Sequence, residues 1–161
     1  NMRVADVVAQ QKELHRADAI FVDIGQGAGV VDRLRQLRHT VIEVPFGGNA
    51  NDPTLYLNRR AEMWTLMRDW LRSGGAIPDD LGLKQELCAP TYSFDTKGRI
   101  KLESKDDIRK RLPEMSPDKA DALALTFAAP VAAPTHLTEL QKRYPHVPRE
   151  DDGETQRWHP W

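Results

Sequence analysis

The chain has little of several features that would assign it to a specialised class of protein. Cysteine occurs once in 161 residues, as Cys88, so an internal disulfide is excluded, and no cysteine–histidine spacing typical of a zinc site is present. This composition fits a reducing compartment. No apolar run approaches the ~20 residues that a membrane-spanning helix needs, and the N-terminal stretch lacks the apolar core of a signal peptide.

Neither sign of charge dominates. The chain has 23 basic and 24 acidic residues and a net charge of -1. This balance gives no general attraction for nucleic acid, although a local basic patch is compatible with it. Apolar residues make up 40% of the chain, enough for one domain with a core. We predict that this domain occupies residues 1–128.

The composition changes after Ala128. Residues 129–161 contain five prolines and are mostly polar, which predicts an extended or flexible tail with one short helix at "THLTELQKRY". Tyr144, Trp158 and Trp161 lie among these prolines and charges. That pattern is typical of a partner-binding segment and equally of a free terminus.

Hydrophobic periodicity predicts alternating helices and strands in the first part of the chain. The pattern indicates a helix at 3–16, a strand at 19–24, a helix at 30–38 and a strand at 40–45. This alternation is the mark of an α/β fold. Further along, it indicates a long helix at 55–71, a short helix or turn at 79–90, a β-hairpin at 91–104 and helices at 104–113 and 116–128, the last capped by Ser116.

The phrase "IFVDIGQGAGVV", residues 20–31, combines a buried strand with closely spaced glycines. We expect "GQGAG" to be a turn between the strand and the next helix. Such a turn resembles the first motif of S-adenosylmethionine-dependent methyltransferases, with Glu43 as the acid for the ribose. Against this alternative, that fold needs about seven strands, and only two convincing core strands are indicated here. A tight, closely packed turn explains the glycines equally well.

Acidic residues suggest a second chemistry. Asp23 ends the buried strand, a costly place for a charge unless it is paired or binds a metal. Asp118 and Asp121 lie three residues apart, on one face of the last predicted helix. Asp118 alone is equally explained as an acid at a helix N-terminus. Carboxylates brought together from a strand and a helix can hold Mg²⁺ or Mn²⁺, and two such ions can hydrolyse a phosphodiester.

Residues 3–128 resemble the nuclease domain of the large terminase subunit of tailed bacteriophages. The resemblance is carried by the phrases "FVDIGQGAGVVDRL", "VPFGGNANDPTLYLNRRAEMWTLMRDWL", "GRIKLESKDDIRKRL" and "SPDKADALALTFA". It implies an RNase H-like fold, with a mixed sheet flanked by helices. It also implies an endonuclease that cuts concatemeric double-stranded DNA during packaging, in the cytoplasm of the bacterial host. The portal protein and the small terminase subunit are the implied partners.

Position by position, the resemblance implies that Asp23, Asp121 and Asp118 are the catalytic ligands of two Mg²⁺ or Mn²⁺ ions. Lys105 is implied to lie near the site or to contact DNA phosphate, and a solvated lysine is an equal alternative. The family has a further catalytic Asp on a strand before the first helix, which this chain lacks, and ATP belongs to a domain upstream of that. We therefore expect a fragment of a longer protein that is weak or inactive alone and tends to self-associate.

A third alternative is a domain without catalytic activity that docks onto the portal or DNA. The segment "LNRRAEMW", residues 57–64, is basic and aromatic, which is compatible with nucleic-acid contact. Its helical spacing instead favours core positions for Met63 and Trp64.

Overall fold

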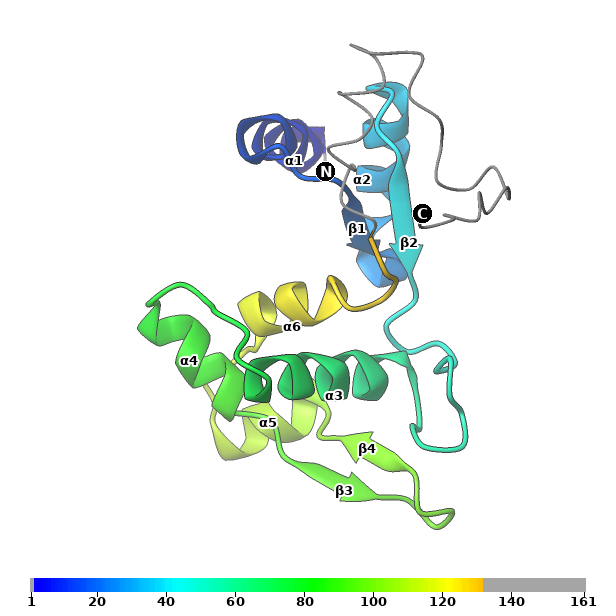
Figure 1. The fold of residues 1–161 in the computed structure, drawn as a ribbon, viewed down its shortest axis with the longest axis vertical. Helices are drawn as coiled ribbons and strands as arrows, with labels where there is room; N and C mark the ends of the chain where they lie inside the picture. Colours follow the sequence, from blue (N-terminus) through cyan, green and yellow to red (C-terminus); the bar gives the residue numbers. More distant parts are fainter. Residues whose placement is uncertain (1, 132–161) are drawn as a thin grey trace, which may run out of the picture. The chain divides into compact units, whose positions relative to one another are not determined.

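The computed structural model describes residues 2–131. Figure 1 shows how helices and short strands alternate along this part of the chain. The elements are α1 (Met2–His15), β1 (Ile20–Asp23), α2 (Ile24–Gln36), β2 (Val41–Val44), α3 (Arg59–Arg72), α4 (Leu81–Cys88), β3 (Tyr92–Phe94), β4 (Ile100–Leu102), α5 (Lys105–Arg111) and α6 (Asp118–Leu125). None of these helices is long and apolar enough to cross a membrane.

The strands within residues 2–131 form two separate pairs. β1 and β2 are parallel, with Ile20 opposite Val41 and Asp23 opposite Val44. β3 and β4 form the predicted hairpin and are antiparallel. The outer edge of β4 is paired too, because the amide of Ile100 donates to the carbonyl of Leu55 at 2.7 Å.

The parallel pair lies between two apolar clusters, because successive side chains along a strand point to opposite faces. Ile20 packs with Ala5 of α1 and Leu34 of α2, which are fully buried. Phe21 and Val44 pack instead with the second cluster, whose fully or almost fully buried members include Met63 and Met67 of α3 and Ala120 and Ala124 of α6. The core positions expected for Met63 and Trp64 are confirmed.

The predicted glycine turn is wrong, because α2 begins at Ile24, immediately after β1. Asp23 caps this helix: its Oδ1 accepts a hydrogen bond from the amide of Gly25 at 3.1 Å. A Cβ atom at Gly27 would lie 2.6 Å from Cγ1 of Val22. Glycine is therefore needed at position 27 for the first turns of α2 to pack closely against β1.

The starts of α3 and α6 also differ from the prediction. α3 begins at Arg59, where Asn58 Oδ1 accepts from the amide of Ala61 at 2.9 Å. At α6 the predicted cap, Ser116, is wrong: the N-cap residue is Pro117, which has no side-chain hydrogen bond. Glu86 of α4 takes this role, and its Oε2 accepts from the amides of Lys119 and Ala120 at 2.6 and 3.0 Å.

The tail prediction falls mostly outside the described residues. This applies to the short helix at "THLTELQKRY" and to Tyr144, Trp158 and Trp161. The boundary at residue 128 stays a prediction.

Candidate active site

A groove of about 910 Å³ is bordered by the end of β1, β4, α5 and the start of α6. Two of the predicted acids, Asp23 and Asp118, line it. Four cationic side chains line it as well: Arg60, Lys101, Lys105 and Arg109. The groove thus combines acids with cations, although the whole chain is nearly neutral.

Asp23 reaches this groove because of its position in β1. It alternates with Val22, so its side chain lies on the face of the sheet that carries Phe21 and the paired Val44. That face packs against α3 and α6. The carboxylate itself is exposed to solvent and accepts a hydrogen bond from the amide of Gly25.

Asp121 is buried, with 6% of its surface exposed, and is held by two donors from α3. Its Oδ1 accepts hydrogen bonds from Trp64 Nε1 at 2.7 Å and from Arg60 Nε at 3.0 Å. The Arg60 guanidinium also lies over the Trp64 ring, 5.6 Å from its centroid. Oδ2 of Asp121 is buried, and its partner in the described part is the ammonium of Lys105, 3.0 Å away.

Lys105, the first residue of α5, joins the two acids of α6. Its Nζ lies 2.8 Å from Asp118 Oδ1 and 3.0 Å from Asp121 Oδ2. Burial lowers the pKa of Lys105, but the adjacent carboxylates of Asp118 and Asp121 outweigh this and raise the pKa above its usual value. The hydrogen bond from Lys105, assisted by Ser116, lowers the pKa of Asp118.

The structure therefore brings Asp118 and Asp121 together through Lys105 and places Asp23 on the same groove. Carboxylate oxygens are the donors that Mg²⁺ and Mn²⁺ prefer, and Oδ2 of Asp121, which Lys105 Nζ approaches to 3.0 Å, is such a donor. Within residues 2–131, however, no three His, Cys, Asp or Glu side chains are arranged to hold a metal ion. The donor chemistry fits a divalent ion, while the arrangement supplies only part of a complete ligand set.

The pairing of Lys105 with Asp118 has a testable consequence for acid titration. The pKa of Asp118 is lower in the folded state than in the unfolded chain. The pair therefore stabilises the fold at pH values above the unfolded-state pKa, and this stabilisation is lost as the pH falls through the folded-state pKa. We expect the Asp118 carboxyl, followed by NMR, to titrate below the ordinary value of 3.8. In Lys105→Met the pKa of Asp118 should rise toward that value, with Ser116 and Arg109 still lowering it, and an unchanged midpoint would contradict the pairing.

Sequence reasoning missed the roles of Arg60, Trp64 and Glu86. Arg60 and Trp64 are four residues apart and therefore share one face of α3. A buried tryptophan N–H needs an acceptor, and this signal could have connected Trp64 to an acid. Glu86 gave no signal, because its contact with α6 joins residues 33 and 34 positions apart.

The structure gives no support to the methyltransferase alternative. Its glycines lie inside α2 rather than in a cofactor-binding turn. Glu43, the proposed ribose ligand, forms an ion pair with Arg35.

A parallel strand pair between helices, with an acid ending its first strand, makes this part of the chain an α/β fold. No protein-family model and no curated protein matches it. The fold is similar to the nuclease domain of the large terminase subunit of bacterial virus Sf6, with a TM-score of 0.63 and 20% identity over 79% of this chain and 72% of that one.

Two further structures of the same relative are similar. One is a mutant of that nuclease domain with manganese, with a TM-score of 0.62 and 21% identity over 78% of this chain and 72% of that one. The other is a mutant of the large terminase subunit from bacteriophage Sf6 with calcium, at the same TM-score and identity over 78% and 71%. The resemblance noted in the sequence and the predicted fold class are confirmed at the level of the fold.

Proposed function

We propose that this chain is the endonuclease domain of a terminase large subunit, which cuts concatemeric DNA by two-metal phosphodiester hydrolysis during genome packaging. One observation carries the proposal. This chain has the fold of a terminase nuclease domain, and its groove is bordered by Asp23, Asp118 and Lys105, the last of which pairs with the buried Asp121. DNA is the proposed substrate.

Asp23, Asp118 and Asp121 are the proposed ligands of Mg²⁺ or Mn²⁺. When bound, such ions activate a water and stabilise the charge on the leaving oxygen. Arg60 and Trp64 fix Oδ1 of Asp121, so the proposed ligand atom is Oδ2, which an ion would take over from Lys105. ATP has no role in this domain and belongs to the ATPase domain that precedes the nuclease in the family.

Phosphate contacts are assigned to cations on the groove that the acids do not fully engage. Lys101 of β4 forms no ion pair with a residue in the range 2–131, and the pair of Arg109 with Asp106 is exposed at 3.2 Å. Exposed pairs of this kind contribute little and can exchange for a phosphate. Lys105 contacts Asp118 and Asp121 and acts mainly on those acids.

The proposal is tested by cleavage of supercoiled plasmid with Mn²⁺. We expect slow cleavage by this chain, because Lys105 pairs with Asp118 and Asp121, and Asp23 forms no three-acid cluster with them in the described part. Replacing Asp23 or Asp121 by asparagine should reduce the rate by about 100-fold, which corresponds to about 2.7 kcal/mol.

Asp32→Asn is the matched control, since Asp32 is exposed on α2, away from the groove. Binding of Mn²⁺, followed by electron paramagnetic resonance, gives a second measure that does not need turnover. Cleavage that survives both Asp23→Asn and Asp121→Asn, or Mn²⁺ binding that Asp121→Asn does not change, would exclude these residues as ligands. Rapid cleavage by the unaltered chain would show that the acids here suffice.

DNA binding gives an independent prediction. Lys101→Ala and Arg109→Ala should each weaken binding of a short duplex, and each should reduce the salt dependence of log K by about 0.9, the loss of one phosphate contact. Lys97→Ala is the control, because Lys97 lies at the exposed tip of the hairpin. Equal effects of all three substitutions would point to non-specific charge instead of the groove.

The portal protein, the small terminase subunit and a location in the bacterial cytoplasm follow from the same proposal. Self-association of the chain is also proposed. Exposed apolar side chains on α1, at Met2, Val4, Val7 and Leu14, support it. Sedimentation at increasing concentration measures it directly.

A further inference from the structure

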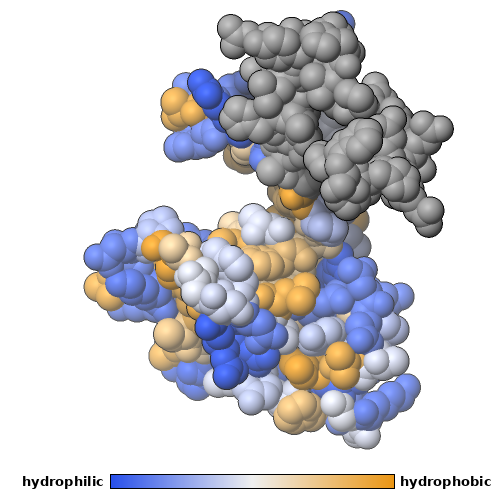
Figure 2. Space-filling view, viewed as in Figure 1, coloured by the Kyte–Doolittle hydropathy of each residue, from blue (hydrophilic) through white to orange (hydrophobic). Residues whose placement is uncertain are grey.

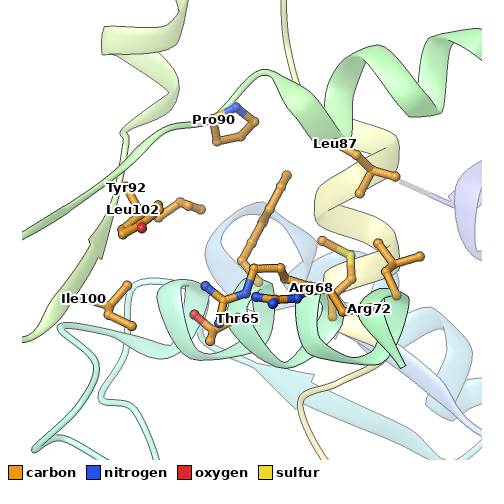
Figure 3. A pocket seen from close by; sticks show the side chains of 11 residues that line it. Thr65, Arg68, Arg72, Leu87, Pro90, Tyr92, Ile100 and Leu102 are labelled. Atoms are coloured by element: carbon orange, nitrogen blue, oxygen red, sulfur yellow. The ribbon is translucent and has the colours of Figure 1, made fainter. Parts of the chain in front are cut away.

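A second groove lies between α3, α4 and the hairpin. It has a volume of about 260 Å³ and is mainly apolar, with walls that include Met67, Leu71, Leu87, Tyr92, Ile100 and Leu102. Figure 3 shows Leu87, Pro90 and the hairpin residues on one side and the α3 residues on the other. Neither the proposed metal ligands nor the proposed phosphate contacts line it.

The outer edge of β3 borders this groove and has free backbone groups. The amide of Glu103 donates to the carbonyl of Thr91, and the amide of Asp95 donates to the carbonyl of Arg99. Hydrogen-bonded pairs alternate along an antiparallel ladder, so the backbone groups of Ser93, which lies midway, also face β4. The amides and carbonyls of Tyr92 and Phe94 therefore face outward, where no described residue pairs with them. β4 differs, since residues 55–57 cover its outer edge.

The side chains on this edge are large, apolar and exposed. Tyr92 and Phe94 are 61% and 63% exposed and meet edge to face, with ring centroids 5.9 Å apart. They lie on the same face of the hairpin as their partners Leu102 and Ile100, which line the groove. Figure 2 shows apolar surface exposed along the hairpin. Proteins normally cover or charge such an edge, because it otherwise accepts a strand from another chain.

Charge at the rim of the groove indicates the kind of strand that fits. Arg68 and Arg72 project from α3 beside the apolar lining (Figure 3). Arg68 pairs with Asp69 at 2.8 Å, where both side chains are about half exposed. Arg72 forms no ion pair with any residue in the described range. A partner with acidic side chains complements this rim.

We propose that β3 is a docking edge for an extended acidic and apolar segment of a partner protein, which adds to the hairpin as a third strand. The backbone groups of Tyr92 and Phe94 pair with the segment, and its apolar side chains continue the face of those two rings above the groove. Its acids meet Arg68 and Arg72. This binding role is separate from the proposed cleavage of DNA.

The test uses the full chain and a fluorescent peptide of about eight residues in which valine and glutamate share one set of alternate positions, with threonine between them, so that both face the groove when the peptide is extended. We expect saturable binding by fluorescence polarisation. The same peptide with lysine in place of glutamate should bind at least about tenfold more weakly. Arg72→Glu should reverse this preference, whereas Arg3→Glu, at an exposed position on α1, should leave it unchanged.

Peptide N-methylation separates strand pairing from non-specific apolar contact. In an extended peptide, only every second amide faces β3 and can pair with it. Methylation of those amides should abolish binding, and methylation of the amides between them should not. Absence of saturable binding, equal binding of the lysine peptide or equal effects of the two methylated sets would overturn the proposal. The proposal would also be overturned if this chain formed a dimer that Phe94→Lys converts to a monomer. A second copy of the chain would then be the occupant of the β3 edge.

Discussion

Replacing Asp121 by alanine is expected to lower the free energy of unfolding by about 3–5 kcal/mol, the usual cost of removing one partner from a buried ion pair. Arg60, whose side chain is only 12% exposed, loses the acceptor of its Nε. Trp64 Nε1 and Lys105 lose their partner at the same time. Urea denaturation of the variant measures the change.

Two substitutions show whether this effect comes from the buried cluster. Asp118→Ala removes an acid from the same helix, but its side chain is 70% exposed, and we expect a change within about 0.5 kcal/mol. Asp121→Asn keeps an oxygen acceptor for Trp64 and should fall between the two. If Asp118→Ala and Asp121→Ala cost the same, the cluster does not stabilise the fold as described.

A second large loss of stability is expected for Glu62→Ala, again about 3–5 kcal/mol. Glu62 is 5% exposed, and its carboxylate accepts from the amides of Asn51 and Asp52 at 2.8 and 3.2 Å and from Arg59 at 2.8 Å. Alanine would leave two amides and Nη1 of the largely buried Arg59 without this acceptor, while Nη2 of Arg59 keeps the carbonyl of Ala128. Hydrogen exchange at Asn51 and Asp52 should accelerate together with the loss of stability.

The control for Glu62 lies on the exposed face of the same helix. Asp69 pairs with Arg68 in solvent, so Asp69→Ala should change the stability by less than about 1 kcal/mol. Glu62→Gln keeps one oxygen acceptor and should be milder than alanine. Unchanged exchange at Asn51 in Glu62→Ala would mean that the carboxylate does not hold the loop before α3.

The sequence predicted the elements whose signal is local. Apolar periodicity located β1, β2 and most of each helix, because a half-buried helix repeats its contacts every three or four residues. The glycines of α2 led to the wrong prediction of a turn, because glycine has a poor helix propensity. Gly27 is needed in this helix because of its close contact with Val22, which no local sequence pattern reveals. Asn58, by contrast, is a recognisable N-cap that the apolar pattern of residues 55–57 obscured.

The candidate site was predictable in its acids and not in their surroundings. Asp23 stood out because a charge at the end of a buried strand is costly, although its carboxylate is in fact exposed and caps α2. Asp121 stood out because it lies beside an apolar helix face. Their partners come from distant segments: Arg60 is 61 residues from Asp121 and Trp64 is 57. Such contacts depend on how α3 packs against α6. Lys105 was singled out, yet its contact with both acids of α6 needed the structure.

The ammonium of Lys105 also determines what happens to this domain without metal. A buried carboxylate such as Asp121 needs a positive charge nearby, and here an amino acid of the chain supplies it. Under the proposed function, folding should therefore not depend on metal, unlike in small zinc domains that unfold when the ion is removed. A chelator should abolish the proposed cleavage of DNA and leave the melting temperature of the domain unchanged.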